Sequence, residues 1–306
     1  MNTTASRRRL VSDPEARVIR VRRWEGGGEW ASVRDSVTVE EPLELRVNTR
    51  SVAVVMRTPG HDDELAVGFL LSEGVVRRRE DIVSIRPYAR NREGNVLDIH
   101  LADAVVVDFQ ELTRHVFGAS SCGLCGKATV EAVRRQFPPV RETFEVTADR
   151  LALLPDAMRV RQAGFDATGG VHAAGLFNSD GRLVCLREDV GRHNAVDKVI
   201  GRCWLEEGRV PSGAVLVVSG RASFEILQKA LAARVAFIAA VGAPSSLAVD
   251  FARRSGQTLV GFVRSNRFNV YAGHGRVRMA EKTALRMGRR TRHPKQVTST
   301  GSTTTG

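Results

Sequence analysis

The strongest constraint on the fold is an alternation of short apolar runs with amphipathic segments between residues 214 and 263. The runs "AVLVVSG", "VAFIAAVG" and "TLVGFV" are almost continuously apolar. The segments between them, "SFEILQKALAAR" and "SSLAVDFARRSG", carry apolar residues at helical spacing. Continuous apolar strands joined by helices are typical of a sheet whose two faces are both buried by crossover helices. The sequence therefore predicts a layered α/β/α domain.

The N-terminal third of the chain has a different pattern. Short alternating runs at residues 17–24, 43–48 and 52–58 predict strands, and they end at Asn or Pro-Gly. The stretch "HDDELAVGFLLSEGVV" (61–76) predicts a helix with acids in its first turn and an apolar stripe. Two further strands are expected around the turn "RNREGN". We therefore expect a smaller β-rich domain ahead of the layered one.

From about residue 116 the pattern predicts a CxxC loop, helices at 127–136, 147–164 and 190–208, and a hairpin over 171–188. The chain is therefore expected to be α/β, or α+β overall. Its expected divisions are a disordered basic tail (1–14), a β-rich N-terminal domain (15–115), an α/β/α domain with the CxxC (116–280) and a basic Thr/Ser/Gly-rich disordered tail (281–306).

The net charge of +12 belongs to the two ends of the chain. Residues 1–23 carry seven arginines against two acids, and residues 276–306 carry eight Lys/Arg against one, so residues 24–275 are formally neutral. A neutral body does not favour nucleic-acid binding. No stretch reaches the roughly 18–20 apolar residues of a membrane span, and the arginines of the first ten residues precede no apolar core. We expect a cytoplasmic protein that binds neither nucleic acid nor membrane.

The loop "SSCGLCGKA" has the features of a reactive thiol. Cys122 and Cys125 stand just before a predicted helix that begins near Lys127. Helix N–H groups and a nearby ammonium stabilise a thiolate and lower the pKa of its thiol. Three chemistries remain open: a structural zinc site, a thioredoxin-like redox pair, and a sulfur carrier that holds a persulfide. Structural zinc usually needs four ligands. Cys185 and Cys203 lie inside a predicted strand and a predicted helix, so we expect them to fill the core and not to form a second ligand pair.

The stretch "TGGVHAAGLF" invites comparison with zinc nucleobase deaminases. Those enzymes carry H-x-E followed later by P-C-x-x-C, with the Glu as proton shuttle. Here Ala174 stands where that Glu is needed, and the CxxC precedes His172. Deaminase activity is therefore not expected, although a layered α/β/α scaffold of that kind remains possible. Zinc bound by Cys122, Cys125 and His172 stays open as an alternative.

Two strand-to-helix turns are rich in small and hydroxyl residues, "VVSGRASFE" and "VGAPSSLA". Free N–H groups, hydroxyls and a guanidinium at a helix start suit phosphate, although ordinary N-capping explains the serines equally well. The dense polar run "REDVGRHNAVDK" (187–198) is a second candidate site. A strand interrupted by Arg-Ser-Asn-Arg at 264–267 is a third, or the polar face of an edge strand. The residues proposed here to bind a nucleotide-like ligand are Ser219, Gly220, Arg221 and His193.

Taken together and in order, these stretches resemble the formate dehydrogenase accessory sulfurtransferases, the FdhD family. The matching stretches include "MRTPGHDDELAVGFLLSEG", "SSCGLCGKA", "TGGVHAAGLF", "REDVGRHNAVDKVIG", "SGRASFEILQKA" and "GAPSSLAVDFARRSGQTLVGFVR". They cover roughly residues 40–275. The resemblance implies a cytidine-deaminase-like α/β/α domain in a cytoplasmic homodimer.

The resemblance also implies a function. Such proteins take sulfur from a cysteine desulfurase as a cysteine persulfide, here on Cys122, with Cys125 as its catalytic neighbour. They pass it to the molybdenum cofactor, in its bis-molybdopterin guanine dinucleotide form, before insertion into formate dehydrogenase. No metal or permanent cofactor is implied. The family's cofactor-binding segment maps onto Phe262, Val263, Arg264, Ser265, Asn266 and Arg267, with Ser265 where many members have Gly. The alternative is a zinc-bound, non-catalytic chaperone of the same cofactor.

Overall fold

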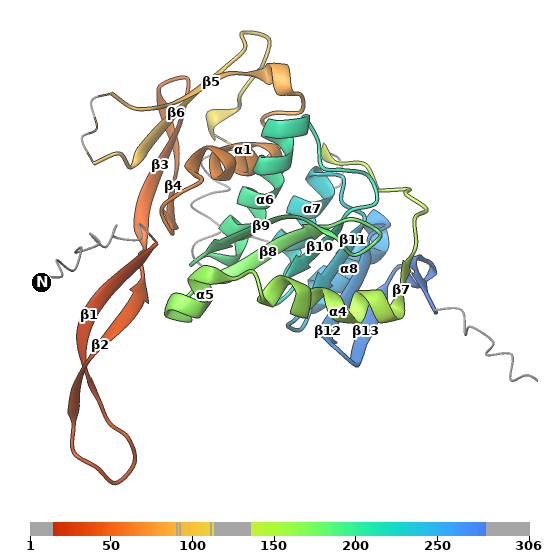
Figure 1. Cartoon of the computed structure of the whole chain (residues 1–306). Coiled ribbons are helices and arrows are strands. Elements are labelled where there is room, and N and C mark those ends of the chain that lie inside the picture. The colour runs from red at the N-terminus through yellow and green to blue at the C-terminus, as the bar shows by residue number, and fades with distance from the viewer. Residues whose placement is uncertain (1–14, 90, 92, 111, 113–135, 280–306) are drawn as a thin grey trace, which may run out of the picture.

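The computed structural model describes residues 15–89, 91, 93–110, 112 and 136–279. Its largest element is a six-stranded sheet in the order β13-β12-β11-β10-β8-β9 (Figure 1). Strands β10, β11 and β12 are parallel, and the other neighbouring pairs are antiparallel. The strands are β8 (His172–Phe177), β9 (Leu183–Asp189), β10 (Val215–Val218), β11 (Phe237–Ala240), β12 (Thr258–Arg264) and β13 (Arg267–Ala272).

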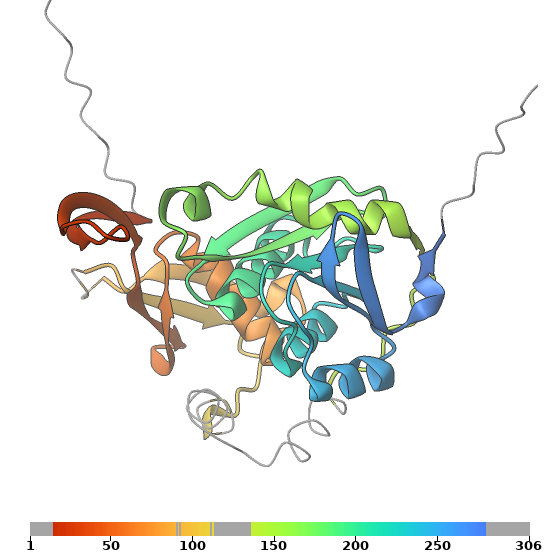
Figure 2. The same cartoon turned by 90° about the horizontal axis from the view of Figure 1, so that it is seen from below.

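Helices cover both faces of this sheet, as the apolar runs predict. Val215 and Val217 pack into a cluster with α4, while Leu216 and Val218 pack into the cluster that contains α1, α6 and α7. Figure 2 shows the sheet between these two layers. The predicted α/β/α layering is confirmed. The helices are α4 (Ala148–Arg159), α5 (Ala163–Thr168), α6 (Arg192–Glu207), α7 (Phe224–Ala232) and α8 (Ser246–Ser255).

A second sheet of four strands, in the order β4-β3-β6-β5, forms the N-terminal part. Helix α1 (Asp62–Ser72) is buried from Glu64 to Ser72 because it lies against α6 as well as this sheet. The close approach of α1 to α6 requires Gly68 and Gly201, since a Cβ at either position would overlap the backbone of the other helix. The strands are β3 (Glu41–Val47), β4 (Arg50–Arg57), β5 (Ile82–Pro87) and β6 (Val96–Leu101).

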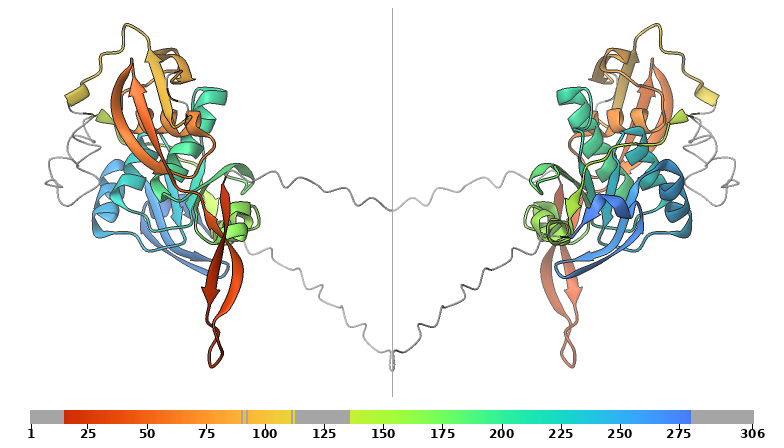
Figure 3. Two further views of the ribbon diagram at one scale, coloured as in Figure 1. Left: turned by 90° about the vertical axis from the view of Figure 1, so that its left-hand side faces the viewer. Right: turned by 90° about the vertical axis from the view of Figure 1, so that its right-hand side faces the viewer.

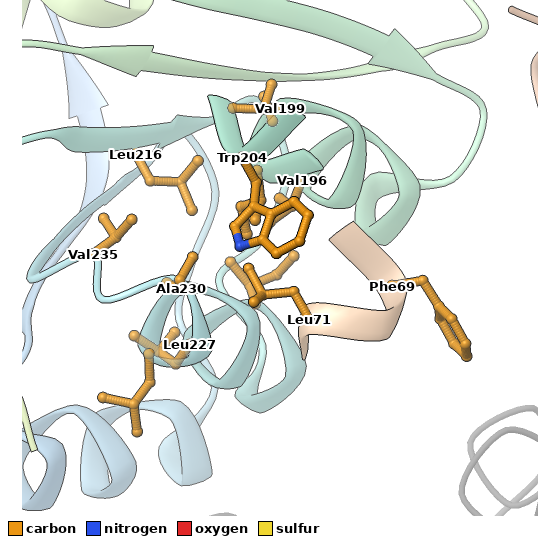
Figure 4. Close-up of a cluster of buried hydrophobic side chains, with 14 of the residues drawn as sticks. Phe69, Leu71, Val196, Val199, Trp204, Leu216, Leu227, Ala230 and Val235 are labelled. Carbon is orange, nitrogen blue, oxygen red and sulfur yellow. The ribbon is translucent and has the colours of Figure 1, made fainter. Parts of the chain in front are cut away.

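One apolar cluster joins these parts. It runs from Leu43 and Ile99 of the smaller sheet through α1 and α6 to the main sheet. Trp204 of α6 is 3% exposed and lies among side chains of α1, α7 and β10 (Figure 4). Because side chains of both sheets meet in this cluster, α1 and α6 are held firmly against each other.

A two-stranded ribbon of β1 (Ala16–Arg23) and β2 (Ala31–Thr38) projects away from the rest of the molecule (Figure 3). At the other end of the described chain, β7 (Val146–Thr147) pairs with β14 (Val277–Arg278). Short 3-10 turns lie at Arg79–Asp81 and His274–Arg276. Within the described residues, no helix is long and apolar enough to cross a membrane.

Two predicted elements differ from the structure. The interrupted strand is a hairpin, in which Arg264 pairs with Arg267 and Ser265-Asn266 form the turn. The predicted helix 147–164 ends at Arg159, and a separate short helix, α5, follows. Pro155 lies inside α4, as expected from its place in the pattern. The predicted helix 127–136, the CxxC loop and both predicted tails lie wholly or almost wholly outside the described residues.

Candidate ligand-binding site

The two cysteines of the predicted sulfur-carrying loop, Cys122 and Cys125, lie outside the described residues. The described residues nearest to them are attached to the body of the protein. Leu112 belongs to the main apolar cluster. The Gln136 side-chain amide donates a 3.0 Å hydrogen bond to the carbonyl oxygen of Glu73, just after α1. Leu112 and Gln136, the described residues on either side of this segment, are therefore both attached to the body.

A cavity of about 390 Å³ opens where the helices that follow β10 and β11 begin. It lies at one edge of the sheet, because parallel strands place the starts of their crossover helices on the same side. Its lining combines two guanidinium groups, hydroxyls and apolar carbons. The residues that matter most are Arg192, Arg221, Ser223, Glu225, Ser245 and Leu247.

The two loops that form the cavity are held together by their backbones. The Gly242 N–H donates a 2.9 Å hydrogen bond to the Gly220 carbonyl, and Ala222 bridges to Pro244. A Cβ at Gly242 would lie 2.8 Å from the Gly220 oxygen and 2.9 Å from the Arg221 nitrogen. Glycine at position 242 is therefore needed for the two helix N-termini to lie side by side. Two neighbouring helix N-termini form an environment that favours an anion.

The cationic groups of the cavity strengthen this preference. Arg192 and Arg221 both line it, and Glu225 is the acidic residue of the lining. Burial raises the pKa of Glu225, but the Ser223 hydroxyl, its own backbone N–H and the nearby positive charge together outweigh burial, so the pKa is lowered. The Nε atom of Arg192 is buried and has no hydrogen-bond partner among the described residues. A buried donor without a partner is costly.

Two histidines border this site, and both have lowered pKa values. Burial and the positive charges of Lys229 and Arg192 lower the pKa of His193 to about 4. Its Nε2 lies 3.3 Å from the Ser223 Oγ. Burial and Arg192 also lower the pKa of His172, against the effect of Asp189. At neutral pH His193 is therefore uncharged and presents a hydrogen-bonding nitrogen to Ser223.

A buried carboxylate fixes the start of α6, from which Arg192 and His193 extend. Asp189 is fully buried and lies 2.7 Å from the Lys198 ammonium. It also accepts hydrogen bonds from the Gly191 N–H, at 2.8 Å, and the Asn194 amide, at 3.0 Å. The Thr58 N–H donates to the same carboxylate at 3.2 Å. The polar run 187–198 therefore has two parts. Arg192 lines the cavity and His193 borders it. Other members bind neighbouring elements: α1, α5, α7 and the residue after β4.

The sequence predicts three binding residues in the turn between β10 and α7, and the structure places only one of them in the lining of the cavity. Arg221 lines the cavity, and Gly220 lies behind it, where a Cβ would be 3.4 Å from His172 Nδ1. Ser219 has a different task. Its Oγ accepts a hydrogen bond from the Ala173 N–H, and its own N–H donates to the Ala173 carbonyl, so it joins β10 to β8.

The segment Phe262–Arg267 lies beside the cavity but is not part of its lining. The Phe262 N–H donates to the Gly242 carbonyl at 3.1 Å, which places the segment next to the second loop. The Arg264 Nη1 is bonded to the carbonyl oxygens of Val241 and Val263, at 2.9 and 2.8 Å. The Val263 side chain is fully buried, whereas Ser265, Asn266 and Arg267 are exposed at the hairpin turn.

Phe262 has a strained backbone. Its φ is 54°, in the left-handed region, and its side chain is 43% exposed. A bulky residue in this region costs of order 1–3 kcal/mol. The strain occurs at a bulge in the β12–β13 ladder and holds an aromatic ring at the surface beside the cavity.

Some lining residues belong to stretches that the sequence marks as candidate sites, but are not singled out within them. Pro244 and Leu247 contribute apolar carbons, and Arg192 supplies the unsatisfied donor. Pro244 could have been predicted, because it lies inside a turn whose residues suit phosphate. Arg192 stands out only as one member of a charged run, so its place at the cavity required the tertiary structure.

No group of three metal-ligating side chains occurs among the described residues. Cys122 and Cys125 lie outside those residues, so the zinc alternative stays a prediction. Cys203 is buried in α6, and Cys185 is partly buried in β9, where its Sγ lies 3.9 Å from the Val199 carbonyl. Both pack in or against the main apolar cluster, as expected for core residues. The structure corrects one expectation, because the two thiols lie within hydrogen-bonding contact of each other and so form a pair.

Comparisons with known proteins agree with the sequence resemblance. The FdhD/NarQ family model matches residues 38–278. A sulfur carrier protein FdhD of Streptomyces coelicolor is 50% identical over 274 residues, covering 85% of this chain and 94% of the relative. The Mycobacterium tuberculosis protein of the same name is 51% identical over 254 residues, covering 79% and 92%.

A solved structure is also similar. A crystal structure from Desulfotalea psychrophila, described as that of a formate dehydrogenase accessory protein, aligns with a TM-score of 0.71 and 25% identity. The alignment covers 86% of this chain and all of the other.

Proposed function

The chain belongs to the FdhD/NarQ family, and from this premise we propose that it is a sulfur carrier for the maturation of formate dehydrogenase. The carrier atom is the sulfur of Cys122. Its thiolate attacks the outer sulfur of a persulfide on a cysteine desulfurase, takes that sulfur, and releases the donor's thiolate. Attack by the Cys125 thiolate on the Cys122 sulfur then releases sulfide and leaves a Cys122–Cys125 disulfide, which a thiol reductant reduces.

The acceptor in this proposal is the molybdenum cofactor in its bis-molybdopterin guanine dinucleotide form, bound as a substrate. The observation that carries the assignment is a cavity lined by Arg192 and Arg221 at the N-termini of two helices, α7 and α8. These groups suit a phosphate. The volume of about 390 Å³ is near the lower end of the ~300–1,000 Å³ typical of ligand pockets. It therefore suits one nucleotide half of the cofactor.

The residues around the cavity have separate roles in this proposal. Arg192 and Arg221 bind the phosphates, and neutral His193 orients the Ser223 hydroxyl. The exposed ring of Phe262 offers a face on which a planar heterocycle can stack. Arg264 supports this segment through its bonds to backbone carbonyls. The remaining features of the proposal follow from the family: a cytoplasmic homodimer whose partners are the desulfurase and formate dehydrogenase.

Intact-mass measurement tests the carrier step. The full chain is incubated with a cysteine desulfurase and cysteine, then weighed before and after reduction. We expect a gain of about one sulfur atom per chain that reductant removes, and no gain in Cys122→Ala. The control Cys203→Ala should behave as the parent, since that thiol is buried. Sulfur transfer that survives Cys122→Ala would refute the carrier. One zinc per chain with no mass gain would favour the chaperone alternative.

Nucleotide binding tests the cavity separately. Guanosine diphosphate should bind the chain, and Arg192→Met and Arg221→Met should each weaken it about 10- to 100-fold, as expected for a charged hydrogen bond. The control Arg182→Met changes an exposed arginine in the β8–β9 turn and should have no effect. Equal losses in all three variants would show that the cavity is not the binding site.

A further inference from the structure

The β1–β2 ribbon has no role in the function proposed above. Nearly all of it precedes residue 38, where the family match begins. Its base is tied to α5 by a 2.7 Å hydrogen bond between the hydroxyls of Thr38 and Thr168. The rest extends away from the body (Figures 1 and 3). Because isolated two-stranded ribbons are only marginally stable in water, this extension is best explained by something that binds to it.

One face of the ribbon carries clustered positive charge. Successive residues of a strand point to opposite faces, so Arg20 and Arg22 share a face, and the register places Arg34 directly opposite Arg20 on that same face. All three are exposed. This arginine face comprises Ala16, Val18, Arg20, Arg22, Ser32, Arg34, Ser36 and Thr38, and contains no acid.

Like charges directly opposite each other destabilise a strand pair. Arg20 and Arg34 therefore weaken a ribbon that is already marginal. By contrast, Arg23 on the opposite face has Asp35 at 3.9 Å. The paired residues of the arginine face thus include no carboxylate to balance their charge, and the acids of the connecting loop, Glu25 and Glu29, lie at the tip of the ribbon. Carboxylates of a partner would balance the arginine face.

The ribbon also exposes large apolar side chains. Trp24, 57% exposed, follows the last residue of β1, and Trp30, 64% exposed, precedes the first residue of β2. Val18 on the arginine face is 63% exposed. Tryptophan and arginine are the residues enriched at the energetic centres of protein–protein interfaces. Clustered arginines alone would suit phosphates, but arginines beside exposed tryptophans favour a protein surface.

We propose that the ribbon is a docking arm for a protein partner, and that its arginine face binds a cluster of carboxylates with apolar side chains beside them. The arm is independent of the cavity and of Cys122, so its failure would leave the proposed sulfur transfer untouched.

The test uses the full chain and a peptide of alternating glutamate and leucine, with a glutamine–leucine peptide for comparison. Binding is followed by acrylamide quenching of tryptophan fluorescence, since Trp24 and Trp30 are exposed and the remaining tryptophan, Trp204, is 3% exposed. We expect the acidic peptide to protect the exposed tryptophans at low salt, and the protection to weaken as salt rises. The glutamine peptide should protect much less.

Two double variants locate the contact. Arg20→Thr/Arg34→Thr should lower peptide affinity about tenfold, as expected for two exposed charge pairs. The thermal stability of this variant should be unchanged or higher, because a Thr–Thr pair replaces two opposed charges. Arg17→Thr/Arg23→Thr, on the opposite face, should leave the affinity within about twofold of the parent.

Four outcomes would overturn the proposal. The first is absence of peptide binding at low salt, and the second is equal loss in both double variants. The third is tighter, face-dependent binding of a DNA duplex, which would make the partner a nucleic acid. The fourth is protection that rises with protein concentration alone, which would make the partner a second copy of this chain.

Discussion

Replacing Asp189 with alanine should destabilise the protein strongly and loosen the cavity. The carboxylate is fully buried and holds four donors: the Lys198 ammonium, two backbone N–H groups and the Asn194 amide. Lys198 is itself only 1% exposed. Alanine therefore leaves a buried positive charge without its counter-ion.

The expected loss is about 4 kcal/mol of unfolding free energy. Removing one partner of a buried ion pair costs about 3–5 kcal/mol, because the remaining charge is uncompensated. Lys198 keeps a 2.8 Å hydrogen bond to the Thr58 carbonyl, which limits the loss. The two N–H groups would add about 1–3 kcal/mol each if nothing replaced the carboxylate. Water entering the vacated space offsets much of that, so we take the middle of the ion-pair range.

Urea denaturation followed by the fluorescence of Trp204 and by circular dichroism measures this change. The double variant Asp189→Ala/Lys198→Met removes both charges, and should recover at least about 2 kcal/mol of the loss. Guanosine diphosphate affinity should also fall in Asp189→Ala, because Asp189 fixes the start of α6 and hence Arg192.

Two results would refute this reasoning. A loss below about 1 kcal/mol in Asp189→Ala would mean that the pair contributes little beyond a solvated one. A double variant no more stable than the single variant would mean that the unpaired Lys198 charge is not the source of the loss.

Three further predictions concern the cavity. The pKa of His193, measured by NMR, should be near 4. The free energy of unfolding should therefore fall as the pH drops from about 6.5 towards 4, because the unfolded histidine binds a proton in this range and the folded one does not. His193→Gln should remove that part of the pH dependence. Gly242→Ala should cost about 1–3 kcal/mol and weaken nucleotide binding, because its Cβ meets the backbone at Gly220, whereas Gly275→Ala, with open space around it, should change neither. Phe262→Gly should weaken nucleotide binding but leave the melting temperature within a few degrees of the parent. The reason is that glycine relieves about 1–3 kcal/mol of backbone strain, which offsets the lost burial of the ring. A large drop in melting temperature would count against the assigned strain.

Much of the candidate site follows from local sequence. The two turns rich in small residues form one edge of the cavity, because consecutive parallel strands bring the starts of their helices together. Arg221, one of the predicted binding residues, lines this cavity, and its role in binding stays a prediction. The sulfur-carrying role of Cys122 stays a prediction, since that residue lies outside the described part of the chain.

Other features of the site depend on contacts between distant residues. Arg192 reaches the cavity only because Asp189 ties α6 to Thr58, which is 131 positions away. The sequence at 264–267 does not predict a hairpin, because Ser-Asn is a weaker turn signal than Asn-Gly. Nor does any local pattern show that Phe262 adopts a left-handed backbone, because that follows from its bond to Gly242 and the bulge in the ladder.

The amino-acid sequence by itself determined the layered sheet, the positions of the small residues in two helix-initiating turns, and membership of the family. These properties arise from periodicity and local chemistry, which a linear pattern records. Only the tertiary structure decided which charged side chains hold α1 and β4 against α6 and which are left to bind a ligand. It alone also places two arginines directly opposite each other on the ribbon. Both features depend on strand register and on the packing of elements that are distant in the sequence. The energies of charge pairing and burial are set by spatial neighbours, and the linear order of residues does not show which residues become neighbours.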